Sequence, residues 1–394
     1  MAVQVQLKLT AGMNLEFIPG LLSFLEQPTT EDAGTSCLWN TRADGVPTAG
    51  TSIVELPERG MGSLGPFVTL TKGSQTWNCA LTNSHVVRPP AVDPDDIVEA
   101  TLQNKTEYDV SYFAPSDAAH TIRHIRAEIE DLSQDLEALE KEKVEREEVG
   151  PRMHPKRAQI IDAHKASIAV LNQKLEVVGK MPITLGRTLA SSGRTIAENC
   201  VMDWALIELS TKPFLNDESH FVNKMPSVPI SDRPFYPDTK EPKEQRFPEG
   251  WPLVEFGRLE EGKWYCKAGR TSRVTGGICL GVRSYCNWLP SQRQRWSKDG
   301  KERAMIEDGV TEEWLITTKN VGPNGAHQGT FCRNGDSGSG VVNNSGRISG
   351  LVYAGAKGLC GPGDQLWSGI CSDIQDVKRS VAEKVPGAVL SLPA

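Results

Sequence analysis

The sequence predicts a mainly β protein into which one pair of helices is inserted. Of its 394 residues, 36 are glycine and 25 are proline, and only 24% are charged, a composition typical of chains with many turns and strands. Short apolar runs separated by turn-forming residues recur through most of the chain. Residues 116–180 instead repeat apolar residues at spacings that alternate between three and four, which is the pattern of packed helices.

These changes of pattern divide the chain into four parts. Residues 1–48 mix a short apolar start with a polar stretch, and we interpret them as an arm that packs on the rest of the chain or as a pro-segment. The other parts are a first β unit with its connection to the second (49–115 and 181–252), a helical hairpin inserted into it (116–180), and a second β unit with a C-terminal helix (253–394).

The first β unit opens with a predicted β-hairpin. The apolar segments 65–71 and 78–83 flank Lys-Gly-Ser-Gln at 72–75, which favours a turn. The small residues of Gly-Ser-Leu-Gly at 62–65 predict a sharp turn just before it. The second strand of this hairpin leads directly to His85.

The inserted segment predicts two helices of similar length joined at Gly150 and Pro151, where the helical pattern breaks. At 1.5 Å per residue, an antiparallel hairpin of this length projects on the order of 40 Å. Its apolar positions are Ile122, Ile125, Ile129, Leu132, Leu136 and Leu139 in the first helix, and Ile161, Ile168, Leu171, Leu175 and Val178 in the second.

After the insertion, the Pro-rich and charged stretch 212–252 predicts an irregular connection. Strands resume from about 253. Residues 267–277 predict a strand, a tight turn and a second strand, and 346–355 predict another strand. Residues 372–385 have helical spacing and predict the closing helix.

Charge and hydropathy exclude several classes of protein. The formal net charge of -7 and the pI of about 5.6 argue against a nucleic-acid role, which requires a basic face. No run approaches the roughly 18 consecutive apolar residues of a membrane span. The first ten residues lack the basic region and apolar core of a signal peptide, so we expect a cytoplasmic, intracellular protein. The odd count of nine cysteines agrees with a reducing compartment in which most thiols are free and buried.

Three short segments contain the residues of a nucleophilic site. His85 lies in Cys-Ala-Leu-Thr-Asn-Ser-His-Val-Val (79–87), Asp203 in Val-Met-Asp-Trp-Ala-Leu-Ile-Glu-Leu (201–209), and Ser337 in Asn-Gly-Asp-Ser-Gly-Ser-Gly (334–340). A serine nucleophile needs a base, and the base needs a carboxylate that orients it. The sequence therefore predicts Ser337 as nucleophile, His85 as general base and Asp203 as the orienting acid.

The loop around Ser337 predicts an oxyanion hole as well. Gly335 and Gly338 let the chain turn so that the N–H groups of Gly335 and Ser337 converge on one point, where they stabilise a developing negative charge. Gly-Asp-Ser-Gly also occurs in ordinary surface loops, but here an apolar strand follows it. Ser339 is the rival hydroxyl, and it lacks the preceding acid.

The other histidines and acids near these segments fit the roles less well. Four other histidines (His120, His124, His154 and His164) belong to the helical insertion, and two of them four residues apart are too few ligands for a metal site, so no metal or other cofactor is expected. Glu198 and Glu208 compete with Asp203, but only Asp203 directly precedes the apolar run, and the adjacent Trp204 is expected to shield its carboxylate from water.

The order His, Asp, Ser and the three segments together resemble the trypsin/chymotrypsin-like serine protease superfamily. The resemblance covers roughly 49–115 and 181–385, and it implies two antiparallel six-stranded β-barrels with the triad between them. The segment 267–277 resembles the opening of the second barrel in intracellular HtrA-like and fungal Ssy5-like proteases. The antiparallel coiled-coil hairpin at 116–180 lies outside the family pattern.

The resemblance also implies where substrate side chains would bind. The position six residues before the nucleophile, the pocket floor in trypsin-like enzymes, is Phe331 rather than an acid, so a preference for Arg or Lys is not expected. The pocket wall would be formed by Val352, Tyr353, Ala354 and Gly355. Cys332 and Cys360 resemble in position a pocket disulfide of secreted relatives, offset by one residue.

Asp336 is the residue that pairs with a new N-terminus, Ile-Val-Gly-Gly, in trypsin zymogens. The chain has no such segment, so Asp336 is expected to use another partner. The sequence as a whole predicts an intracellular, regulatory serine endopeptidase that acts on protein or peptide substrates. The alternative is a pseudoprotease or scaffold whose hairpin at 116–180 recruits a protein partner or a second copy of the chain.

Overall fold

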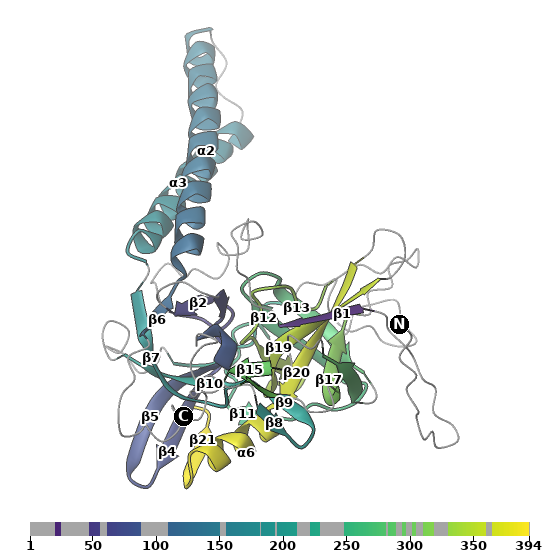
Figure 1. Ribbon diagram of the computed structural model, residues 1–394. Coiled ribbons are helices and arrows are strands. Elements are labelled where there is room, and N and C mark those ends of the chain that lie inside the picture. The colour runs from purple at the N-terminus through teal and green to yellow at the C-terminus, as the bar shows by residue number, and fades with distance from the viewer. Residues whose placement is uncertain are drawn as a thin grey trace.

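The structure is a computed structural model that describes residues 20–24, 47–55, 61–87, 109–149, 155–181, 183–193, 195–210, 221–228, 248–280, 283–288, 294–296, 302–304, 310–318, 330–359 and 365–393. Two mainly antiparallel sheets lie side by side, and a pair of helices projects from the first of them (Figure 1). The chain is mainly β, as the sequence predicts.

The first sheet contains eight strands within the described residues, where the family resemblance implies six. In order across the sheet these are β21 (Ala388–Ser391), β4 (Phe67–Lys72), β5 (Gln75–Thr82), β10 (Ala205–Leu209), β7 (Ile183–Ser191), β6 (Asp109–Tyr112), β2 (Ser52–Glu55) and β3 (Met61–Ser63). The hairpin of β4 and β5 is the one predicted ahead of His85. The sequence pattern does not reveal β3 and β21, because β3 has only three residues and β21 follows the C-terminal helix.

The second sheet has nine described strands, and six of them pair around a closed path. The path runs through β19 (Arg347–Leu359), β18 (Gly340–Asn343), β12 (Trp264–Gly269), β13 (Arg273–Cys279), β17 (Val310–Thr317) and β20 (Gln365–Asp373), and β20 pairs back to β19. Three further strands lie at its margins: β1 (Gly20–Phe24), β11 (Glu255–Phe256) and β14 (Ser284–Asn287).

Two small ribbons complete the described strands. They are β8 (Thr195–Ala197) with β9 (Cys200–Met202), and β15 (Gln294–Trp296) with β16 (Glu302–Ala304).

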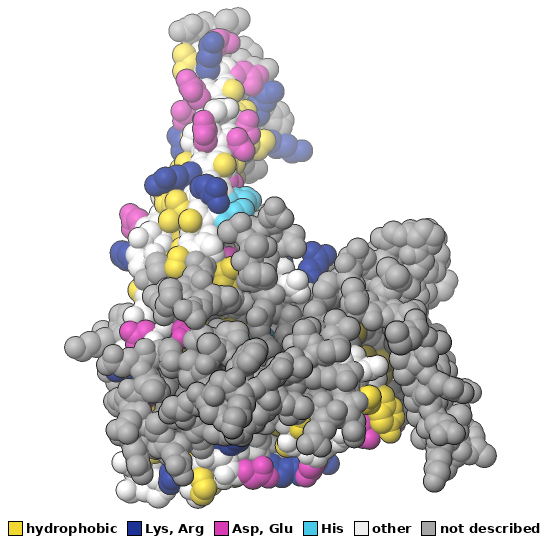
Figure 2. All heavy atoms as spheres, viewed as in Figure 1, with side chains coloured by type: hydrophobic (Ala, Val, Ile, Leu, Met, Phe, Trp, Pro, Cys, Tyr) yellow, Lys and Arg dark blue, Asp and Glu magenta, His cyan; other side chains and the backbone are white. Residues whose placement is uncertain are grey.

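The inserted segment forms two helices, as predicted, but they are not of similar length, since the first has 35 residues and the second 24. Helix α2 (Pro115–Val149) runs away from the sheets and α3 (Pro155–Val178) returns beside it (Figure 1). The outer part of the pair carries acidic, basic and apolar side chains mixed together (Figure 2). Its base packs against the first sheet, because Ala118, Ile125, Leu171 and Val178 are buried in the same apolar cluster as Ile53.

The largest apolar cluster lies between the two sheets and beneath the C-terminal helix α6 (Ile374–Lys384). It joins Leu81 of β5 and Cys266 of β12 to Val377 and Val381 of α6. Helix α6 begins at Asp373, whose side chain accepts the N–H of Gln375 and caps the helix. This shared core fixes the two sheets relative to each other, and with them the loops that carry the predicted site residues.

Candidate active site

His85 and Asp203 form a doubly hydrogen-bonded pair in the first sheet. His85 lies in the short 3₁₀ helix η3 (Ser84–Val86), directly after β5, and Asp203 lies between β9 and β10. His85 Nδ1 is 2.5 Å from Asp203 Oδ2, and the His85 backbone N–H donates to Oδ1 at 3.1 Å. The two side chains are 2% and 0% exposed, so water does not compete for either bond.

The side chain of Asn83 holds the backbone of Asp203 beside His85. Asn83 Nδ2 donates to the backbone carbonyl of Asp203 at 2.5 Å, a contact that sequence reasoning missed. The indole N–H of Trp204 donates to Ser380 Oγ of α6 at 3.0 Å, and its ring packs in the core between the sheets. Asp203 itself is 1% exposed.

Ser337 lies in the tight loop before β18. Gly335 has φ +92° and Gly338 has φ +93°, so glycine is required on both sides of the intervening Asp336 and Ser337. Ser337 Oγ donates to the carbonyl of Tyr353 at 3.1 Å, and the Gly338 amide donates to the carbonyl of Val352 at 2.9 Å. The loop therefore rests on β19.

The same loop also touches the first sheet close to His85. The Ser63 amide donates to the carbonyl of Ser337 at 2.7 Å, and Ser63 Oγ donates to the carbonyl of Gly335 at 3.0 Å. A Cβ on Gly62 would lie 2.4 Å from Val86 Cγ2 and 2.8 Å from the Ser337 oxygen. The sharp turn predicted at 62–65 is thus wrong: β3 occupies 61–63, and its glycine permits close approach of the loop.

Two backbone donors of this loop have no acceptor within the described part of the chain. They are the N–H groups of Gly335 and Ser337, the pair that the sequence predicts as an oxyanion hole. The Ser337 N–H shares its peptide plane with the Asp336 carbonyl, which accepts the amide of Ser339 at 3.1 Å and its hydroxyl at 2.6 Å, so this N–H is held in place before any ligand binds.

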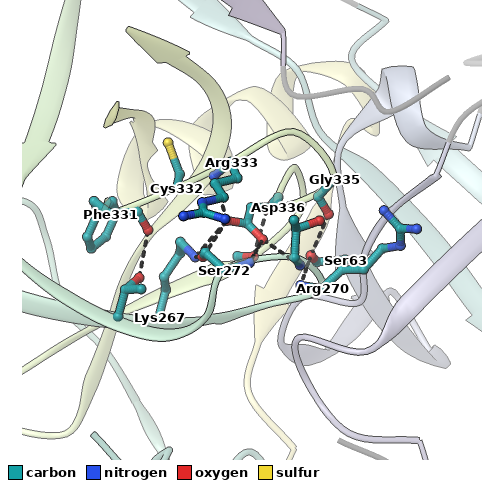
Figure 3. A network of polar contacts seen from close by, with 12 residues as sticks. Ser63, Lys267, Arg270, Ser272, Phe331, Cys332, Arg333, Gly335 and Asp336 are labelled. Carbon is teal, nitrogen blue, oxygen red and sulfur yellow. Dashed lines mark hydrogen bonds and ion pairs between the residues drawn. The ribbon is translucent and has the colours of Figure 1, made fainter. Parts of the chain in front are cut away.

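Asp336 has the alternative partner that the sequence requires, and this partner is Lys267 of β12. Lys267 Nζ lies 3.1 Å from Asp336 Oδ2, and both side chains are fully buried. The Asp336 carboxylate also accepts the amides of Thr271 (2.9 Å) and Ser272 (3.1 Å) and the Ser272 hydroxyl (2.5 Å). Figure 3 shows Asp336 enclosed in this way between Lys267, Ser272 and Arg333. An unpaired charge here would cost about 3–5 kcal/mol.

The predicted pocket residues are buried rather than aligned along an open surface. Phe331, Val352, Tyr353 and Ala354 are each 0% exposed, and Gly355 is buried. The Phe331 ring packs against the backbone of the second sheet, since a Cβ on Gly369 would lie 2.6 Å from its Cδ1. Phe331 belongs to the apolar core of the second sheet, so no acidic group occupies this position.

Metal ligands do not gather in the described residues. No three His, Cys, Asp or Glu side chains there are placed to hold an ion. No described helix is both long enough and apolar enough to cross a membrane. The seven described cysteines are free and buried, as the sequence predicts for most thiols, while Cys37 and Cys360 lie outside the described residues.

Comparisons with known proteins find similarity in structure alone. No family model matches the chain, and no curated protein does. Among solved structures, chymotrypsin of Cellulomonas bogoriensis is 9% identical with a TM-score of 0.37, covering 88% of this chain and 98% of that one. Thermobifida fusca protease A (11%, TM-score 0.36) and Nocardiopsis protease (10%, TM-score 0.36) likewise cover 88% of this chain and 98% of theirs. The first of these neighbours is named as a chymotrypsin and the other two as proteases.

Proposed function

We propose that the chain is a serine endopeptidase that cleaves peptide bonds through an acyl-enzyme on Ser337. The observation that carries the proposal is the buried Asp203 carboxylate, which engages both the ring and the backbone of His85. A carboxylate at Nδ1 selects the tautomer in which Nε2 accepts a proton. His85 then has the orientation that a general base requires, and the Ser337 loop is hydrogen-bonded to the strand β3 beside it.

The proposed reaction has two steps, formation of an acyl-enzyme and its hydrolysis. Ser337 Oγ attacks the substrate carbonyl carbon while its proton passes to His85 Nε2, and the carbonyl oxygen becomes an oxyanion bound by the N–H groups of Gly335 and Ser337. Collapse breaks the C–N bond, and His85 gives the proton to the leaving amine. Water then hydrolyses the ester by the reverse sequence. In the free protein Ser337 Oγ donates to Tyr353, so the hydroxyl must rotate toward His85 before attack.

The proposed substrates are proteins or peptides with small or apolar side chains at the cleaved position. Phe331, which the resemblance places at the pocket floor, is apolar and buried, so a bound Arg or Lys would find no carboxylate there. Peptide substrates that differ only at this position would rank the preference directly.

Labelling of purified protein with a fluorophosphonate tests the proposal. Wild type should label and should hydrolyse casein, whereas Ser337→Ala should do neither. Ser339→Ala is the matched control, because its hydroxyl donates to the carbonyl of Asp336 at 2.6 Å in the same loop and should be dispensable for labelling. If wild type fails to label, or if Ser337→Ala labels normally, the proposal is wrong. In the first case the scaffold alternative replaces it.

We further propose a reducing, intracellular location. Burial raises the pKa of Cys200 and of Cys279 to about 12, so little thiolate is available for oxidation. Intact-mass measurement after thiol alkylation under denaturing conditions should find every cysteine modified in protein purified without reductant. A shortfall of two alkyl groups would show a disulfide and contradict this location.

A further inference from the structure

A continuous path of buried polar contacts connects the base of the helical hairpin to the loop of Ser337. The path begins at Asp117 in the first turn of α2. Both carboxylate oxygens of Asp117 accept from the guanidinium of Arg270, from Nε and from Nη2, each at 2.6 Å. The Asp117 and Arg270 side chains are 0% and 1% exposed, so this bidentate pair is shielded from water.

The backbone of Arg270 connects this ion pair to Ser63. Its amide N–H donates to Ser63 Oγ at 2.9 Å, and Ser63 Oγ donates to the carbonyl of Gly335 at 3.0 Å. The Ser63 amide holds the carbonyl of Ser337 at 2.7 Å. Ser63 therefore holds the peptide units before and after the one that carries the Ser337 N–H, and Figure 3 shows it between Arg270 and Gly335.

The residues that follow Arg270 hold the same loop from its other side. Arg270 is the first residue of the turn between β12 and β13, and the amides of the next two, Thr271 and Ser272, both donate to Asp336. One three-residue turn thus orients Gly335, through Ser63, and Asp336 directly. The side chain that anchors this turn is Arg270, and its buried carboxylate partner belongs to the hairpin.

We propose that Asp117 is a positioning residue for the oxyanion hole, and that the inserted hairpin thereby sets the activity of Ser337. The inference rests on the proposed peptidase function. Asp117 touches neither substrate nor the reacting atoms. It fixes Arg270, and the turn that begins at Arg270 aligns the N–H groups of Gly335 and Ser337 with the position of the oxyanion.

Loss of the Asp117–Arg270 ion pair is expected to lower kcat rather than to raise KM. Without the carboxylate, the buried guanidinium loses its bidentate partner, and its displacement shifts the turn and the three backbone amides of that turn. Misalignment of oxyanion donors weakens binding of the transition state more than binding of the substrate. We therefore expect Asp117→Asn to lower kcat on the order of 100-fold, with little change in KM.

The matched control is Glu140→Gln. Glu140 pairs with Lys165 across the two helices at 2.7 Å, but this pair is exposed and does not touch the loop. Kinetics on peptide substrate should place Glu140→Gln beside wild type. Ser63→Ala should reproduce the loss of kcat without disturbing the buried ion pair. This second variant tests the inference even if Asp117→Asn fails to fold. In the double variant, Asp117→Asn should add little to Ser63→Ala, because both interrupt one path.

Hydrogen–deuterium exchange of residues 333–339 gives a readout that does not need activity. Exchange should rise in Asp117→Asn and Ser63→Ala but not in Glu140→Gln. Unchanged exchange in Asp117→Asn, or an effect on KM alone, or independent losses of kcat in the double variant, would each overturn the inference. If no variant and not even wild type hydrolyses substrate while exchange still responds, the connection stands and the proposed peptidase function is what fails.

Discussion

Asp203 shows how much one buried side chain can determine. Its two oxygens accept from two different groups of the same residue, the ring and the amide of His85. An amide side chain has one acceptor atom and one donor group, so it can satisfy only one of these contacts.

Asp203→Asn should therefore keep the fold and lose peptidase activity by roughly 10³–10⁴-fold in kcat, because either the ring or the backbone N–H then faces an NH₂ group. Steady-state hydrolysis and circular dichroism measure the two effects. Glu208→Gln, on the neighbouring strand β10, is the control and should retain activity. A large loss in Glu208→Gln with activity preserved in Asp203→Asn would mean that Glu208 is the acid.

A second residue-scale effect concerns stability. Glu313 of β17 is 1% exposed and accepts the N–H of Val201 at 2.8 Å, and burial raises its pKa to about 7 from an ordinary value of 4.5. The folded protein thus binds a proton more tightly than the unfolded chain. Between these two pKa values stability must fall as pH rises, because the folded state holds more protons there.

Urea unfolding at pH 5 and at pH 8 checks this expectation. Wild type should lose at most roughly 3 kcal/mol over that interval through Glu313. Glu313→Gln keeps an acceptor for Val201 and should flatten the dependence. Equal slopes for the two proteins would show that Glu313 does not titrate in this window.

Among the secondary-structure elements, β1 has the most direct bearing on access to the site. It pairs antiparallel with β19, from Gly20 opposite Gly358 to Phe24 opposite Ala354, while β20 pairs with the other edge of this part of β19. Phe24 thus lies opposite the residue next to Tyr353, whose carbonyl accepts the Ser337 hydroxyl. The strand edge that leads away from the proposed nucleophile is already occupied by the chain's own N-terminal segment (Figure 1).

A peptide that adds as a strand to this edge must displace β1. The variant Leu22→Pro/Ser23→Pro removes two N–H groups from β1 and should free the edge. If β1 is paired about nine-tenths of the time, KM for a peptide substrate should fall about tenfold. A synthetic peptide with the sequence of residues 20–24 should then inhibit the variant more strongly than a scrambled one. Identical KM values in wild type and variant would show that β1 does not compete with substrate.

Across the whole molecule, the hairpin has two parts with different roles. Near its base, Asp117, Ala118 and Ile125 are buried against the sheets, as is Leu171. The outer part carries exposed ion pairs and exposed apolar side chains such as Val144 and Ile160. Such exposed pairs contribute about 0–1 kcal/mol each, so the outer part adds little to the stability of the sheets.

Replacing 133–167 by a short Gly/Ser linker should leave both the melting temperature and peptide hydrolysis close to wild type. Replacing 117–180 removes the partner of Arg270 and several buried apolar residues, and it should destabilise the protein by several kcal/mol. Thermal unfolding and fluorophosphonate labelling of both variants distinguish the two results. Equal stability of the two would mean that the base is as dispensable as the tip.

Light scattering and pull-down on the 133–167 replacement also test the predicted docking role of the hairpin. Loss of self-association or of a partner with peptide hydrolysis intact would support it. Unchanged assembly in both proteins would leave the outer hairpin as a solvated helical pair.

The sequence by itself determined the elements whose signals are local. The heptad spacing located both helices of the insertion, the turn residues at 72–75 located the hairpin of β4 and β5, and the glycines around Ser337 located the tight loop. The sequence also singled out His85 and Asp203, because each adjoins an apolar strand. Periodicity and turn chemistry depend on a few neighbouring residues, so they can be recognised in the sequence without knowledge of the fold.

Only the tertiary structure decided which distant residues meet. Lys267 is 69 residues from Asp336, and Arg270 is 153 residues from Asp117, and neither pairing has a sequence signature. The place of β1 beside β19 and of β21 beside β4 is likewise absent from local pattern. Buried charges must find partners wherever packing brings them together, so the identity of each partner is a property of the folded chain rather than of any segment.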